Sequence, residues 1–188
     1  MSDEERQATP TAMLRQEHEV ILQALGVLER LGQRLERGEP VAGVALNWLI
    51  DFFGHFVDRW HHGKEEQHLF PALERHGLPR EQGPLAVMLH EHQDGRVLLG
   101  IIREGDDRRT AQAIKNYTRL LRAHIDKENW VLFPLAEQVL GDEEQQGLLK
   151  AFEAVEQAVA GPASREQLLA ELAGLEGEGE PGRDEERV

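Results

Sequence analysis

Apolar residues recur about every 3.6 positions along most of the chain, which is the period of an α-helix. Four long stretches share this pattern, and each begins or ends near a glycine or proline that favours a helix boundary. The stretches run from Thr9-Pro10-Thr11 to Gly38, from Pro40 to about His76, from Gly83-Pro84 to Gly105, and from about Asp107 to about Leu140.

The connections between these stretches are short, at Gly38-Glu39-Pro40, Gly77-Leu78-Pro79 and Gly105-Asp106-Asp107. Short connections place successive helices antiparallel to one another. A chain of 188 residues is long enough for one domain with a substantial core. The pattern therefore predicts an all-α fold, an antiparallel up-down-up-down four-helix bundle over residues 10–140.

The remaining segments lie outside this bundle. After Gly141, apolar residues on one face predict a shorter helix, and a capping-box pattern at Ser164 and Gln167 predicts one or two further turns. We therefore expect residues 141–173 to form short accessory C-terminal helices. Residues 1–9 and the glycine-rich acidic tail 174–188 are predicted to be disordered.

One motif occurs twice, as HHGKEEQHLFPAL at 61–73 and HIDKENWVLFPLA at 124–136. Three residues keep the same spacing in both copies, and they define the register of the repeat. They are His61, Glu65 and Pro71 in the first copy and His124, Glu128 and Pro134 in the second. Residues four apart lie on one face of a helix, so each copy projects an imidazole and a carboxylate together. A proline inside each helix predicts a kink just beyond the glutamate.

The other two stretches each carry a Glu-His dipeptide, Glu17-His18 and Glu91-His92. His18 and His61 are equidistant from the first turn, and the second and third turns relate His92 to Glu65 and to His124 in the same way. Residues equidistant from the turn of an antiparallel hairpin lie at one height. We therefore expect one level of the bundle to contain His18, His61, Glu65, His92, His124 and Glu128.

Such a cluster suits metal ions. The chain has no cysteine, so its ligands must be nitrogen and oxygen. Two buried carboxylates are costly unless cations compensate them, and two that can bridge suit a pair of iron or manganese ions. Each metal would receive two imidazoles and two carboxylate oxygens. A solvent-derived oxo or hydroxo bridge would leave a position open for dioxygen or another small ligand.

These motifs resemble the hemerythrin-like, or HHE cation-binding, domains over about residues 11–140. The resemblance implies a non-haem di-iron centre with two iron ions, manganese or zinc being less favoured, and its ligands are His18, His61, Glu65, His92, His124 and Glu128. Respiratory hemerythrins of animals carry an extra histidine ligand and an aspartate in the last motif. This chain has Glu128 and only His124 there, which resembles the bacterial branch and disfavours simple oxygen transport.

His62 and Glu66 offer a competing register, but His62 is rotated about 100° from His61 on a helix and breaks the spacing to Pro71. We therefore place His62 beside the site or on the surface. His90 cannot point inward together with His92, whereas His68 shares the face of His61 and is a candidate pocket wall or spare ligand.

Several residues near the motifs are expected to have structural roles. Glu17 and Glu91 are candidate acceptors that would orient the imidazoles, but we favour the solvated surface for both, because adjacent helical residues point about 100° apart. Lys64 and Lys127, each one residue before a predicted ligand, are expected to face outward for the same reason. The aromatic residues expected in the core or pocket lining are Trp60, Phe70, Trp130 and Phe133.

Composition limits the function further. The formal net charge of −14 disfavours a nucleic-acid partner, and no apolar run is long enough to cross a membrane. With no visible secretory signal, we expect a cytoplasmic protein, a monomer or weak homodimer, whose partner is a small molecule.

Two classes of function fit these features. One is a di-iron protein that binds or reduces dioxygen, peroxide or nitric oxide, in storage, detoxification or stress-related iron chemistry. The other is a metal-dependent oxygen or redox sensor, or an interaction module, without turnover. The residues do not decide whether the protein is an enzyme. A metal-free bundle is disfavoured by the shared height of the six residues.

Overall fold

The computed structural model describes residues 9–105, 107–158 and 165–177, and these ranges contain helices and turns but no strand. The all-helical prediction is therefore confirmed. The predicted N-terminal segment lies outside the described residues except for Thr9, as does the acidic tail beyond residue 177. Among the helices described here, none is both long and apolar enough to span a membrane.

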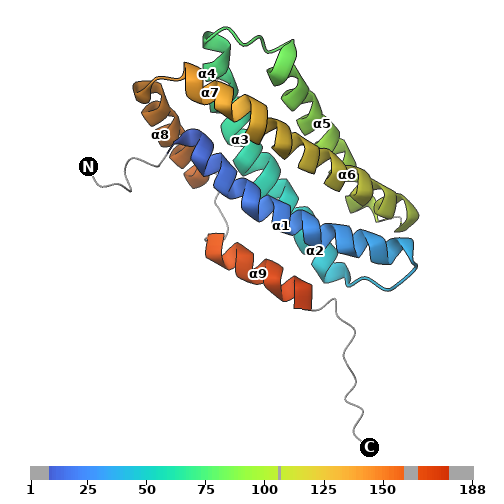
Figure 1. Ribbon diagram of the computed structural model, residues 1–188. Helices are drawn as coiled ribbons and strands as arrows, with labels where there is room; N and C mark the ends of the chain where they lie inside the picture. The colour runs from blue at the N-terminus through green and yellow to red at the C-terminus, as the bar shows by residue number, and fades with distance from the viewer. Residues whose placement is uncertain (1–8, 106, 159–164, 178–188) are drawn as a thin grey trace, which may run out of the picture.

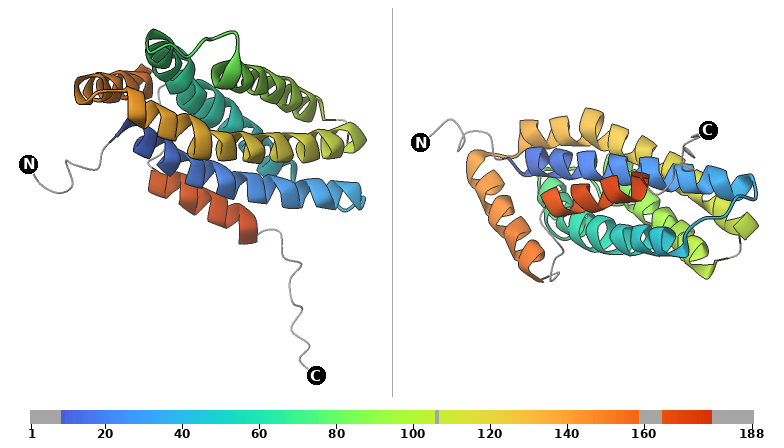
Figure 2. Two further views of the ribbon diagram at one scale, coloured as in Figure 1. Left: turned by 45° about the horizontal axis from the view of Figure 1, so that its top comes forward. Right: turned by 90° about the horizontal axis from the view of Figure 1, so that it is seen from below.

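Four helical rods lie side by side (Figures 1 and 2). The first is α1 (Pro10–Glu36) and the third is α5 (Gly83–Glu104). The second rod is composite, and consists of α2 (Gly43–Phe52), η1 (Phe53–His61), α3 (His62–Lys64), η2 (Glu65–Leu69) and α4 (Phe70–Arg75). The fourth consists of α6 (Asp107–Lys127), η3 (Glu128–Leu132) and α7 (Phe133–Val139).

Most rod boundaries follow the predicted signals. The Thr9 side chain caps α1 by accepting the Ala12 N–H at 3.1 Å. Gly105 ends α5 with φ of 78°, a left-handed conformation that glycine adopts readily. The second rod begins at Gly43 rather than at Pro40. The Pro40 carbonyl accepts a hydrogen bond from the Arg34 side chain at 2.6 Å, so this residue belongs to the connecting turn.

The η segments are π-helical, and two of them begin at the repeated glutamates. The Phe70 N–H bonds to the Glu65 carbonyl and the Phe133 N–H bonds to the Glu128 carbonyl, five residues back in each case. Pro71 and Pro134 follow immediately. The irregularity predicted at the two prolines therefore takes the form of a widened turn, in a position often associated with functional sites.

Two apolar clusters fill the space between the rods. One contains Ile21, Phe53 and Tyr117, and the other contains Phe70, Phe133 and Phe152. Along every rod, the predicted histidine falls between residues of the first cluster and residues of the second. The site is therefore enclosed by apolar packing at both ends.

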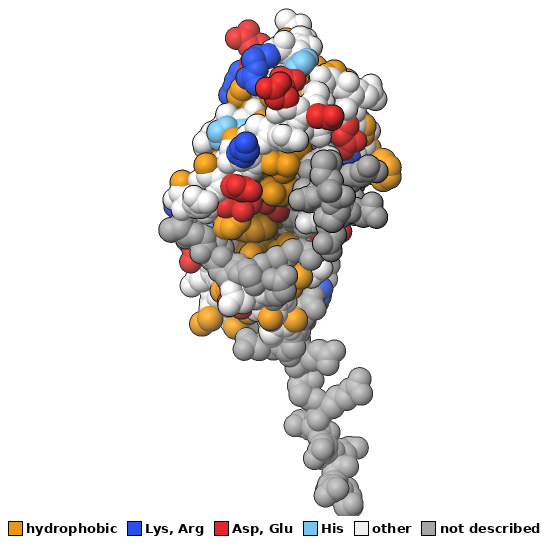
Figure 3. Space-filling model, turned by 90° about the vertical axis from the view of Figure 1, so that its left-hand side faces the viewer, with side chains coloured by type: hydrophobic (Ala, Val, Ile, Leu, Met, Phe, Trp, Pro, Cys, Tyr) orange, Lys and Arg blue, Asp and Glu red, His pale blue; other side chains and the backbone are white. Residues whose placement is uncertain are grey.

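The C-terminal extension packs against the rods. α8 (Asp142–Ala158) adds the fully buried Phe152 to the second cluster, and α9 (Arg165–Gly177) lies along α1 (Figure 2) and buries Leu168 and Leu172. α9 is longer than the one or two turns predicted and ends four residues beyond the predicted boundary at 173. On the α8 side of the molecule, acidic, basic and apolar side chains are interspersed (Figure 3).

Candidate metal centre

The structure brings all six predicted residues together, from all four rods. They are His18, His61, Glu65, His92, His124 and Glu128, and none is more than 1% exposed. The equal heights inferred from the three turns therefore agree with where the side chains lie. The packing of α1 on α6 and of α5 on α6 carries the histidines of those helices inward.

The histidines form two pairs. The Nε2 atoms of His18 and His61 are 3.0 Å apart, and those of His92 and His124 are also 3.0 Å apart. All four rings thus direct the same nitrogen toward the middle of the bundle. This leaves two neighbouring positions, each flanked by two imidazoles.

Each glutamate reaches both pairs. Glu65 Oε1 lies 3.8 Å from His61 Nε2, and its Oε2 lies 3.5 Å from His92 Nε2. Glu128 Oε2 lies 3.1 Å from His18 Nε2, and its Oε1 lies 3.1 Å from His124 Nε2. The two carboxylates therefore present one oxygen to each position, which is the arrangement of bridging ligands.

The carboxylates of Glu65 and Glu128 have no hydrogen-bond partner among the described residues. None of their four oxygens accepts a hydrogen bond, although all are fully buried. Burial raises the pKa of Glu65 well above its usual range, and the negative charge of Glu128 raises it further. For Glu128, burial acts in the same direction but His124 and His18 outweigh it, so its pKa lies well below the usual range. Cations between the imidazoles and carboxylates would satisfy these atoms, so the donor set fits two metal ions.

The outward nitrogen of every ring has a fixed acceptor. His18 Nδ1 bonds to Asn129 Oδ1 at 2.9 Å, and His61 Nδ1 bonds to Glu17 Oε2 at 2.8 Å. The other two bonds are His92 Nδ1 to Glu66 at 2.7 Å and His124 Nδ1 to Glu91 at 3.0 Å. The acceptors are three carboxylates and the amide oxygen of Asn129, so Nδ1 of each ring donates the outer hydrogen bond and Nε2 is the atom that faces the centre.

These contacts correct the prediction that Glu17 and Glu91 lie on the solvated surface. Each glutamate serves the histidine of a neighbouring rod rather than the adjacent histidine in its own dipeptide. The 100° between adjacent helical positions turns the glutamate toward that next rod, where His61 or His124 approaches it. Glu17 is 9% exposed and also accepts the Trp60 indole N–H at 3.2 Å.

The prediction that the repeated lysines face outward is wrong for Lys64. This residue is fully buried, its ammonium bonds to Glu17 and to Glu156 of α8, the latter at 2.5 Å, and it lies 5.2 Å from the Trp60 ring centre. Lys127 makes the corresponding bond to Glu91 but remains 43% exposed. The difference arises because α8 covers the first copy of the motif.

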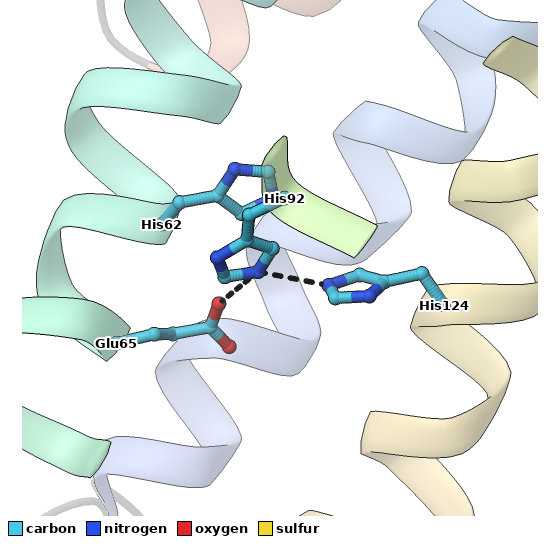
Figure 4. A group of neighbouring side chains, drawn as sticks. All are labelled: His62, Glu65, His92 and His124. Carbon is cyan, nitrogen blue, oxygen red and sulfur yellow. Dashed lines mark hydrogen bonds and ion pairs between the residues drawn. The ribbon is translucent and has the colours of Figure 1, made fainter. Parts of the chain in front are cut away.

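His62 lies beside the site, which is one of its two predicted places, and not on the surface. It is 5% exposed, and its ring stacks on His92 with centroids 3.7 Å apart (Figure 4). One of its nitrogens lies within 4.8 Å of ligand atoms of Glu65, His92 and His124. Neither nitrogen has a hydrogen-bond partner within the part of the chain that the structure describes. Burial, and then the charge of His92, lower the pKa of His62 well below its usual value, so the ring is neutral.

The remaining histidines lie outside the cluster. His68 is half-buried with its ring 6.5 Å from Phe152, and His90 is exposed beside Asp94. His55 is exposed, and His76 bonds to Glu144 at 2.8 Å.

The aromatic residues divide into two groups. Phe133 stacks on His18 and Phe70 stacks on His92, with centroids 5.5 and 5.9 Å apart. Both therefore line the site as predicted. Trp130 was expected in the core or lining but is 80% exposed, because Glu128 and Leu132 occupy the buried positions of η3.

The hemerythrin HHE cation-binding domain matches residues 9–136 of this chain. The chain therefore belongs to this family of cation-binding domains. The resemblance seen in the repeated motifs is thereby confirmed.

Relatives of this chain include proteins with and without a described role. Uncharacterized protein Rv1995 of Mycobacterium tuberculosis is 26% identical over 184 residues, which cover 93% of this chain and 71% of that protein. Iron-sulfur cluster repair protein YtfE of Edwardsiella ictaluri is 31% identical over 139 residues, 68% of this chain and 61% of the relative. YtfE of an Enterobacter species is 36% identical over 98 residues, 46% of this chain and 42% of the relative. No solved structure matches the chain.

Proposed function

We propose that the protein is a non-haem di-iron protein in which the four rods form an up-down-up-down bundle over residues 10–140. One observation carries the proposal: two buried carboxylates each face both histidine pairs and have no hydrogen-bond partner among the described residues. The proposed ligands are His18, His61, Glu65, His92, His124 and Glu128. Manganese or zinc fits the same donors but is less favoured.

Two iron ions at these positions would supply one electron each to a small molecule such as dioxygen, peroxide or nitric oxide. The protein's own contribution is to hold and shield the donors. Asn129, Glu17, Glu66 and Glu91 fix the imidazole rings, and Phe70 and Phe133 cover them with apolar surface. Such enclosure limits the entry of water and protons.

Turnover or stress-related iron chemistry is preferred to simple oxygen carriage, because the ligand set differs from that of the respiratory oxygen carriers. The name of the YtfE relatives, iron-sulfur cluster repair protein, is consistent with this preference. We extend that role to this chain only as a proposal, since the chain covers 61% of one such relative and 42% of the other.

The alternative is a metal-dependent sensor or interaction module. A specific contact supports it: Glu156 of α8 bonds to Lys64, Lys64 bonds to Glu17, and Glu17 holds His61. A change at the centre therefore has a direct route to α8. Hydrogen exchange in α8 should differ between metal-loaded and metal-free protein if α8 reports the metal state, and should be equal in both if it does not.

The test of the main proposal is anaerobic loading with ferrous iron, followed by metal analysis and optical spectra before and after exposure to oxygen. Two irons per chain, with oxo-bridge absorption after oxidation, are expected. One zinc per chain after such loading, without that absorption, would contradict the di-iron centre.

The reaction type requires a second measurement on the same preparation. Stopped-flow mixing of the reduced protein with oxygen is followed by evacuation. Irreversible oxidation with consumption of peroxide would support turnover, whereas recovery of the starting spectrum would show a carrier. No reaction at all would favour the sensor or interaction module.

A further inference from the structure

The two copies of the motif differ at one buried position beside the site. Offsetting the copies so that His61 matches His124 places His62 opposite Ile125. Both residues are buried. The same offset places Asp58, one turn before His62, opposite Leu121. The first copy therefore carries a polar pair where the second carries an apolar pair.

His62 lies close to an outer carboxylate, as His61, His92 and His124 do. Its Nδ1 is 3.8 Å from Asp58 Oδ1. Arg96 donates to Asp58 at 2.6 Å and to Glu66 at 2.7 Å, and Glu66 in turn holds His92. Arg96 therefore holds both Glu66, the acceptor for His92, and Asp58, a potential acceptor for His62.

We propose that His62 is a third imidazole donor at the metal position of His92 and His124. This inference rests on the proposed dinuclear centre and adds a residue outside the six matched by motif. The position of His92 and His124 would then have five protein donors with the two carboxylates, whereas that of His18 and His61 has four. The two metals are inequivalent as a result.

The ring of His62 must turn to bind. It lies within 16° of the plane of His92, so its lone pairs are not directed at the position that His92 faces. A small pocket of about 10 Å³, lined by Asp58, His62, His92 and Arg96 among others, adjoins the ring. A hydrogen bond from Nδ1 to Asp58, together with metal binding by Nε2, would satisfy the two nitrogens that have no partner among the described residues.

The sharpest variant is His62→Ile, because isoleucine already occupies the equivalent buried position at Ile125. If His62 were only packing, this change would remove two unsatisfied polar atoms and leave metal binding intact. If His62 is a ligand, cobalt(II) titration should show one of the two binding steps weakened at least tenfold. The Mössbauer spectrum of iron-57-loaded protein should change from two resolved environments toward one.

A control histidine lies on the same rod outside the cluster. His68→Ile should leave both cobalt affinities and both iron environments as in the unmodified protein. Unchanged affinities and an unchanged spectrum in His62→Ile would overturn the proposal. Failure of the unmodified protein to bind two metal ions would instead overturn the dinuclear centre itself, so the two failures are distinguishable.

A measurement on the unmodified protein does not depend on the variant folding. In the cobalt(II)-loaded protein, imidazole N–H protons of bound histidines give strongly shifted, exchangeable proton NMR signals. Five such signals are expected if His62 binds. Four would contradict its role as a ligand.

Discussion

The repeated lysine shows how the same residue acts differently in two copies of one motif. Lys64 and Lys127 both bond to a glutamate that holds a site histidine. Lys64 is fully buried and also pairs with Glu156, whereas Lys127 is 43% exposed. A buried charge that loses its partner is costly, while an exposed ion pair contributes little.

We therefore expect Lys64→Met to destabilise the metal-free protein by roughly 3 kcal/mol, because Glu17 and Glu156 lose their shared cation. Lys127→Met should cost about 1 kcal/mol or less, since Glu91 keeps His124 and access to solvent. Urea unfolding of both variants measures the difference. Equal effects would show that burial of Lys64 under α8 does not matter energetically.

Sequence reasoning identified the six clustered residues but missed their supports. His61 and Glu65 were found because the repeat and the three turns define heights along the rods. Height does not define which neighbouring rod a side chain meets. Glu17 and Asn129 therefore could not be assigned, since each serves a histidine more than 40 positions away in the chain. The position after each repeated glutamate, occupied by Glu66 in one copy and Asn129 in the other, was the available signal.

At the scale of elements, the helix boundaries were predictable where glycine or proline sets them, as at Pro10 and Gly105. The π-helical turns at Glu65 and Glu128 were not, because apolar periodicity averages over one extra residue per turn. The packing of α8 and α9 was also underestimated. Short amphipathic segments do not reveal whether they dock, and here Phe152 is completely buried.

Truncating that side chain tests whether α8 is part of the core. Phe152→Ala should destabilise the protein by about 3–5 kcal/mol, because it leaves a cavity beside Lys64 and His68. Iron content per folded chain should not change, since Phe152 is not among the clustered ligand atoms. Thermal unfolding and metal analysis check both statements. Glu153→Ala, on the exposed face of the same helix, should be nearly neutral; a similar loss there would mean that α8 is sensitive for another reason.

At the scale of the whole molecule, the fold contains a destabilising feature, buried carboxylates, that bound metal would compensate. Two apolar clusters enclose a level at which buried carboxylates have no hydrogen-bond partner among the described residues. Unsatisfied buried polar groups destabilise the folded state. Ions that bind only the folded protein stabilise it by an amount that grows with the logarithm of their free concentration once that exceeds the dissociation constant. The same residues should therefore weaken the metal-free protein and strengthen the loaded one.

Glu65→Gln should separate these two effects, because it preserves the shape of the side chain and removes its charge. In metal-free protein at neutral pH we expect a gain of about 1–3 kcal/mol, since a buried carboxyl without hydrogen-bond partners is replaced by a neutral amide. The added stability that metal confers, about 2.7 kcal/mol at one hundred times the dissociation constant, should be largely lost. Glu66→Gln is the matched control: it weakens bonds from His92 and Arg96, so it should lower the stability of the metal-free protein. Unfolding curves recorded with and without metal measure both effects. If the Glu65→Gln protein is less stable without metal and is still stabilised by metal, this carboxylate is not a bridging ligand.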